Sequence, residues 1–129
     1  MEIIIRKKNE NNGIDLKKYF KKWHADFCMC TMSDRLYSPR WEIEDDVYII
    51  YDNNKPIGAF FLGNYTIYNA YLCKEYRGKG IIKKILDFVS KKHGCALIST
   101  DIPAIANCYA KYCKIINIEK KVIVFSYDK

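Results

Sequence analysis

Between residues 66 and 93, a strand-like run, a basic turn with two glycines and an amphipathic helix follow one another directly. The turn contains Gly78 and Gly80, and the apolar stripe of the helix begins immediately after it. Glycine lets the backbone approach a ligand closely, and the first N–H groups of a helix have no partner within the helix. Together with the positive end of the helix dipole, such groups form an anion site. The segment therefore predicts a seat for a phosphate or pyrophosphate.

Two common nucleotide motifs do not fit this turn. A P-loop requires Lys-Ser/Thr after its second glycine, but Gly80 is followed by Ile81 and Ile82, so no hydroxyl is available for magnesium. A dinucleotide fingerprint requires a third glycine at position 83, which is Lys83, and the only acidic residue near the required distance is Asp101. The residues thus argue against both kinds of nucleotide site.

The turn resembles the acetyl-CoA signature of the GNAT-type N-acetyltransferase superfamily, Gln/Arg-x-x-Gly-x-Gly/Ala. Here Arg77 and Gly80 occupy the first and fourth positions, while Ile82 stands where the family has a small residue. The resemblance implies that this segment binds the diphosphate of acetyl-CoA. The cofactor-binding residues expected on this basis are Arg77, Gly78, Lys79, Gly80, Ile81, Ile82 and Lys83.

Length and composition indicate one folded domain covering residues 1–129. Half of the residues are apolar, and no apolar run approaches the roughly 20 residues that span a bilayer. The expected location is the cytoplasm, with six reduced cysteines and no metal site. The formal net charge of +7 suits a phosphate-rich cofactor, and equally a nucleic acid bound without sequence preference.

The periodicity of apolar residues predicts an α+β (α/β, GNAT-like) fold. A helix is expected from Ile14 to about Phe27, an irregular segment with a short helix over 28–46, a helix over 80–93 that Gly94 ends, and another helix starting near Asp101. The expected strands are residues 2–8, 47–51, 57–62, 66–72, 96–100, 115–118 and 122–127.

This order of elements also resembles the GNAT fold over nearly the whole chain. The resemblance implies a central mixed, mostly antiparallel sheet of six to seven strands with helices on both faces. It further implies a splay between strands four and five, in which the pantetheine arm of the cofactor lies. The end of strand four, residues Tyr71, Leu72 and Cys73, is then expected to contact the thioester end of the cofactor, with Cys73 as a packing thiol.

The leaving thiolate is commonly protonated in this family by a tyrosine on the helix after strand five. The resemblance points to Tyr109 as this acid, with Tyr112 one helical turn on as the fallback, although the Gly-Phe that the family has nearby is missing. No general base can be identified. Acidic residues cluster just before the second strand, where they could attract a cationic amine or form a solvated loop: Glu42, Glu44, Asp45 and Asp46.

The leading hypothesis is an acetyl-CoA-dependent N-acetyltransferase that acts on a primary amine of a small molecule or protein. The alternative is a catalytically inactive GNAT-like module that binds CoA or a partner. A nucleic-acid binder ranks last, because the chain has no arginine-rich stripe or recognisable RNA motif. The sequence leaves the acceptor and a homodimer open.

Overall fold

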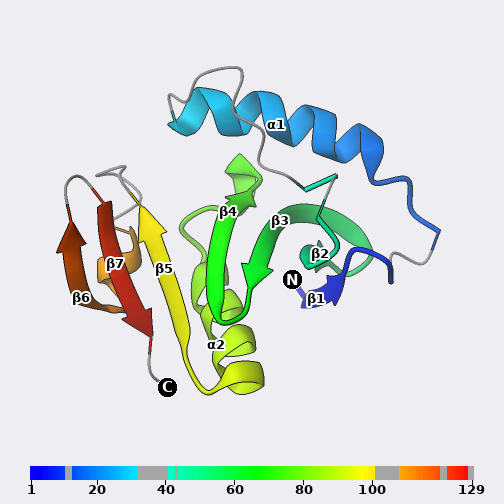
Figure 1. The fold of residues 1–129 in the computed structure, drawn as a ribbon. Helices are drawn as coiled ribbons and strands as arrows, with labels where there is room; N and C mark the ends of the chain where they lie inside the picture. Colours follow the sequence, from blue (N-terminus) through cyan, green and yellow to red (C-terminus); the bar gives the residue numbers. More distant parts are fainter. Residues whose placement is uncertain (11–12, 32–40, 43, 101–107, 120–121, 128–129) are drawn as a thin grey trace. The chain divides into compact units, whose positions relative to one another are not determined.

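The computed structural model describes residues 1–10, 13–31, 41–42, 44–100, 108–119 and 122–127. Seven strands form one sheet in the order β1-β2-β3-β4-β5-β7-β6 (Figure 1). The strands are β1 (Ile3–Lys7), β2 (Val47–Asp52), β3 (Lys55–Gly63), β4 (Thr66–Leu72), β5 (Ala96–Thr100), β6 (Lys114–Glu119) and β7 (Val122–Tyr127). The helices are α1 (Lys17–Thr31), α2 (Ile81–His93) and the 3₁₀ turn η1 (Lys74–Tyr76).

The sheet is mixed and mostly antiparallel, as the sequence predicts. Antiparallel registers join β1 to β2, β2 to β3, β5 to β7 and β6 to β7. The parallel register is that of β4 and β5, which pairs Thr66 with Leu97 and Ile67 with Ile98. Parallel neighbours need a long crossover, and here the segment containing α2 provides it.

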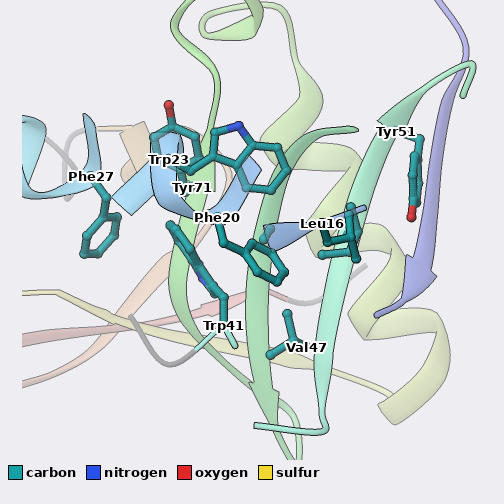
Figure 2. Packing of buried hydrophobic residues seen from close by; sticks show 10 residues of the cluster. Leu16, Phe20, Trp23, Phe27, Trp41, Val47, Tyr51 and Tyr71 are labelled. Carbon is teal, nitrogen blue, oxygen red and sulfur yellow. The ribbon is translucent and has the colours of Figure 1, made fainter. Parts of the chain in front are cut away.

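The chain forms two compact units, residues 1–61 with 69–79 and residues 62–68 with 80–129. An aromatic cluster fills the core of the first unit (Figure 2). Trp23 on α1 packs against Trp41 with ring centroids 6.3 Å apart and against Tyr71 of β4 at 5.8 Å. Phe20 and Phe27, at helical spacing from Trp23, belong to the same cluster. This packing holds α1 against the end of β4.

The second unit is built around α2. Its buried apolar residues Ile81, Ile85, Leu86 and Val89 lie along one face, and the helix contacts β5. Gly94 ends the helix as predicted: its φ is +85° and its N–H donates to the carbonyl of Ser90 at 2.7 Å.

The helix boundaries differ from the prediction at α1. The helix begins at Lys17, because the Asp15 carboxylate accepts a hydrogen bond from the Lys17 N–H at 3.1 Å and so satisfies a free donor of the first turn. It continues to Thr31, through a stretch predicted to be irregular from residue 28. Residues 32–40 and 43 of the segment predicted to be irregular with a short helix lie outside the described part. The start of the helix predicted near Asp101 is also outside it, whereas residues 108–110 are helical.

Within the described residues, none of the helices is long and apolar enough to cross a bilayer.

Candidate functional site

The turn between η1 and α2 has the backbone shape that its glycines predict. Gly78 has φ +76° and Gly80, which caps α2, has φ +79°. L-residues adopt this left-handed region only at a cost, whereas glycine enters it freely. A Cβ built on either glycine would have no protein atom within 4 Å beyond its chain neighbours. The described residues therefore leave the Cβ side of both glycines unobstructed.

The N-terminus of α2 carries nothing that competes for an anion. Its cap forms no side-chain hydrogen bond, and its first turn has no acidic residue. In the described part of the chain, no backbone acceptor outside α2 is bonded to the amides of residues 78–83. These amides and the helix dipole can thus act on a phosphate. The side chain of Ile81 is buried and that of Ile82 is partly buried.

The structure places the Arg77 side chain against α1 rather than out in solvent. Its Nη2 donates to Oδ2 of Asp26 at 2.8 Å, and its Nε donates to the Leu72 carbonyl at 2.8 Å. Its guanidinium also lies 5.6 Å from the centre of the Tyr71 ring. Arg77, expected to contact phosphate, therefore joins α1 to the end of β4 in this structure.

Asp26 is a site residue that the sequence reasoning missed. Its carboxylate also accepts the Tyr71 hydroxyl at 2.6 Å. Burial, followed by this hydrogen bond to Asp26, raises the pKa of Tyr71 well above its usual range, so the phenol remains protonated and donates. The available signal was that Asp26 is the one acidic residue in an otherwise lysine-rich helix.

The end of β4 is tightly packed. Tyr71 and Leu72 are buried, and the Cys73 N–H donates to the Ile57 carbonyl of β3 at 2.8 Å. Burial, with a smaller effect of Glu75, raises the pKa of the Cys73 thiol, so the thiol stays protonated and is a poor nucleophile. The packing role expected of Cys73 stays a prediction.

A bend in the backbone precedes this end. Asn69 lies within β4 at φ +52°, and its carbonyl accepts a hydrogen bond from the indole Nε1 of Trp41 at 3.0 Å. Trp41 thus fixes the main chain of β4 two residues before Tyr71. The splay expected between β4 and β5 involves residues of both units and stays a prediction.

A second basic group accompanies Lys79. The ammonium groups of Lys79 and Lys55 each lie 5.8 Å from the centre of the Tyr76 ring. The Tyr76 hydroxyl donates to Oδ2 of Asp52 at 2.8 Å, which lowers the pKa of that carboxyl. The ring therefore gathers two cations at the start of the glycine turn. Lys55 is the first residue of β3, and no sequence signal pointed to this role.

Lys83, the last residue of the expected cofactor-binding segment, interacts within α2. Its ammonium lies 3.2 Å from Oδ2 of Asp87, one helical turn on. The hydrogen bond with Asp87 raises the pKa of Lys83. Asp87 also accepts the Tyr127 hydroxyl of β7. The structure thus engages Lys83 in an exposed ion pair, which contributes little to stability.

Tyr109, the expected acid, lies in the second unit. It is 8% exposed, and its ring packs edge-on against Phe125 of β7 with centroids 6.0 Å apart. Burial, with smaller effects of Cys108 and Cys113, raises the pKa of its phenol. A raised pKa makes proton donation to a thiolate more uphill. Tyr112, the fallback, is 36% exposed.

The acidic segment before β2 is used partly by the protein itself. The Lys7 ammonium lies 3.5 Å from Oδ1 of Asp46. Lys8 donates to the carbonyls of Trp41, Glu42 and Glu44, which holds this segment against β1. The structure therefore explains the position of the segment through Lys8, and any attraction of an amine substrate stays a prediction.

Comparisons with known proteins identify the fold. No family model matches the chain, and no curated protein matches it. Solved structures match along almost the entire chain. The PaiA N-acetyltransferase of Thermoplasma acidophilum, in complex with coenzyme A, is similar with a TM-score of 0.64 and 17% identity over 100% of both chains. A GNAT family acetyltransferase from Elizabethkingia anophelis with acetyl-CoA bound gives a TM-score of 0.62 and 15% identity over 98% of both.

A third structure, an acetyltransferase of the GNAT family from Staphylococcus aureus, gives a TM-score of 0.66 and 16% identity over 98% of this chain and 99% of that chain. The resemblance predicted from the turn at Arg77–Gly80 is confirmed at the level of the fold, and so are the mixed seven-stranded sheet and its parallel pair. The chain has the fold of the GNAT acetyltransferases.

Proposed function

We propose that this protein is an acetyl-CoA-dependent N-acetyltransferase that passes the acetyl group directly to a primary amine of a small molecule or protein. The observation that carries the proposal is the open, left-handed glycine turn at Gly78 and Gly80, directly before a helix N-terminus, in a chain with the GNAT fold. Two structural neighbours contain coenzyme A or acetyl-CoA, the ligand that this turn suits. The proposed compartment is the cytoplasm, whose reducing conditions keep thiols such as Cys73 free.

The residues of the turn would bind the cofactor through the main chain. The amides of Gly80, Ile81, Ile82 and Lys83 and the dipole of α2 suit a diphosphate. Lys79 and Lys55 add positive charge near the turn, and we assign both to phosphate contacts. Tyr71, Leu72 and Cys73 are assigned to the arm of the cofactor that ends in the thioester.

The chemistry requires a neutral amine and a proton for the departing thiolate. A C–N bond forms as the C–S bond breaks, and the amine loses a proton while the thiolate gains one. A free lysine amine has a pKa of about 10.4, so it must lose its proton before or during attack. Tyr109 is the proposed donor to the thiolate, and Tyr112 is the second candidate because it is more exposed.

The glycine turn can be tested against a matched control in the same helix. Gly80→Glu places a carboxylate where the diphosphate is proposed to lie, and we expect at least a tenfold loss of affinity for CoA by calorimetry. Gly94→Glu introduces the same side chain at the other end of α2, also at positive φ and also into open space. Both substitutions cost about 1–2 kcal/mol of stability for the backbone conformation. Only Gly80→Glu should impair binding, and equal affinities in the two variants would contradict the site.

A second candidate function is a CoA-binding module without catalysis. Two observations favour it: the burial of Tyr109 and the engagement of Arg77 with Asp26. Release of free thiol from acetyl-CoA in the presence of a panel of primary amines separates the two functions. The acetyltransferase proposal requires amine-dependent release above the rate without protein. A protein that binds CoA but leaves every amine unmodified would support the second candidate.

A further inference from the structure

Strand β6 forms one edge of the sheet, and its exposed side chains are unusually apolar for such a position. Among the described strands it neighbours β7 alone. Ile115, Ile116 and Ile118 are 53%, 55% and 64% exposed. An edge strand offers backbone groups to another chain, and proteins usually protect it with charged residues or cover it. Three isoleucines within one six-residue strand do the opposite, because they add apolar surface to the free backbone.

A bulge gathers two of these isoleucines on one face. The register pairs Ile115 with Phe125 and Ile118 with Ile123, and it shifts between Ile115 and Asn117. Residues directly opposite in an antiparallel pair project to the same face, and Phe125 and Ile123, two positions apart, share a face. In a regular strand, Ile115 and Ile118 would lie on opposite faces because they are three positions apart. The bulge therefore makes them a continuous apolar strip beside Phe125.

Two copies of β6 placed side by side in an antiparallel manner present matching residues to each other. A two-fold axis through the middle of the strand brings Ile115 of one chain opposite Ile118 of a second copy, and Ile118 opposite Ile115. These pairings require both isoleucines to lie on one face, which the bulge provides. The same axis brings Lys114 opposite position 119, where the sequence has glutamate. The sequence thus supplies opposite charges for both ends of the paired strands.

We propose that β6 pairs in an antiparallel manner with β6 of a second copy of this chain, to form a two-fold symmetric dimer. Because the same edge of each chain is used, the contact closes on itself and does not extend into a fibre. The four isoleucines at positions 115 and 118 form its apolar centre, and lysine–glutamate pairs flank it. All the residues involved belong to the second unit, and the inference is independent of the proposed enzymatic activity.

The first experiment measures mass in solution by sedimentation equilibrium. The wild-type chain is expected to show twice its 15.2 kDa mass. The variant Ile115→Lys/Ile118→Lys is expected to be a monomer with unchanged circular dichroism, since both side chains are exposed in the single chain. A wild-type protein that stays monomeric up to about 0.1 mM overturns the proposal. A double variant that remains dimeric also overturns it.

The second experiment tests the register by exchanging charges. Lys114→Glu and Glu119→Lys each place like charges opposite one another twice in the dimer, and each is expected to weaken dimerisation about tenfold. The two substitutions together restore opposite charges and are expected to return the dissociation constant to within about threefold of the wild-type value. This exchange leaves the isoleucines and the fold of the single chain intact. Failure of the combined variant to recover overturns the proposed pairing.

Discussion

At the scale of single residues, one carboxylate organises the end of β4. Asp26 receives a hydrogen bond from the Tyr71 hydroxyl and another from the Arg77 guanidinium. This arrangement could not be predicted from the sequence, because Tyr71 and Arg77 are 45 and 51 positions from Asp26 and no local pattern links them. The glycines of the turn were predictable, since their role depends on local backbone geometry.

Tyr51 presents the opposite case, a hydroxyl without a partner. The residue is fully buried in β2, and its hydroxyl is the one buried side-chain polar atom without a hydrogen bond among the described residues. A buried hydroxyl without a hydrogen bond lowers the free energy of unfolding. The ring of Tyr51 makes a separate contact, because the Arg6 guanidinium lies 5.4 Å from its centre.

We expect Tyr51→Phe to raise the free energy of unfolding by about 1 kcal/mol, because it removes the unpaired hydroxyl and keeps the ring. The matched change Tyr71→Phe should lower it by about 1–2 kcal/mol, since it removes a hydrogen bond to a charged acceptor. Urea denaturation of both variants checks the signs. A loss of stability in Tyr51→Phe would mean that its hydroxyl has a partner in solution.

At the scale of elements, the backbones of β3 and β4 approach each other closely at Gly58. A Cβ on Gly58 would collide with the carbonyl oxygen of Tyr71. Because the obstacle is backbone, a small side-chain movement cannot relieve it. Gly58 therefore permits the strands to approach where β4 leads into Cys73.

The expected consequence is that Gly58→Ala destabilises the protein by about 2–3 kcal/mol, as β3 must move away from β4. Gly13→Ala is the control, because Gly13 has φ +80° but open space around its Cβ, and it should cost only about 1 kcal/mol. Chemical denaturation of the two variants gives the comparison. Equal losses would show that the close approach does not constrain the strands.

Elements bounded by clear turn or cap residues were predicted most accurately. The bounds of β4 and β5 agree with the sequence, and α2 ends at the predicted glycine. The predicted end of α1, at about Phe27, was wrong. The cysteines and methionine that follow do not end a helix, and α1 continues to Thr31. The face on which an edge strand presents its isoleucines was not predictable either, since the bulge in β6 leaves no mark on the sequence.

At the scale of the whole molecule, burial raises the pKa of several side chains, so they keep their protons to higher pH in the folded protein. Burial raises the pKa of the Cys113 thiol to about 11, and it raises the pKa of the Tyr109 phenol. These groups lose their protons more readily in the unfolded chain than in the folded protein. The free energy of unfolding should therefore fall as the pH rises from about 9.

Part of this loss of stability at alkaline pH can be assigned to Cys113. Cys113→Ala should reduce the decline in stability between pH 9 and 11 by on the order of 1 kcal/mol, because the partly buried thiol is no longer there to titrate and solvent screens part of its effect. Cys108→Ala removes an exposed thiol nearby and serves as the control. Urea midpoints at pH 8, 9, 10 and 11 measure the slope. An unchanged slope in Cys113→Ala would contradict the assignment.

The turn at Gly78 and Gly80 has a consequence for how such proteins diverge. Its shape depends on two torsion angles that glycine alone adopts without strain, and the groups it presents are main-chain amides common to every residue. Substitutions elsewhere can accumulate while the path of the chain here stays the same. A chain can therefore keep this turn while most other positions change, and the fold itself is shared here with solved structures at only 15–17% sequence identity.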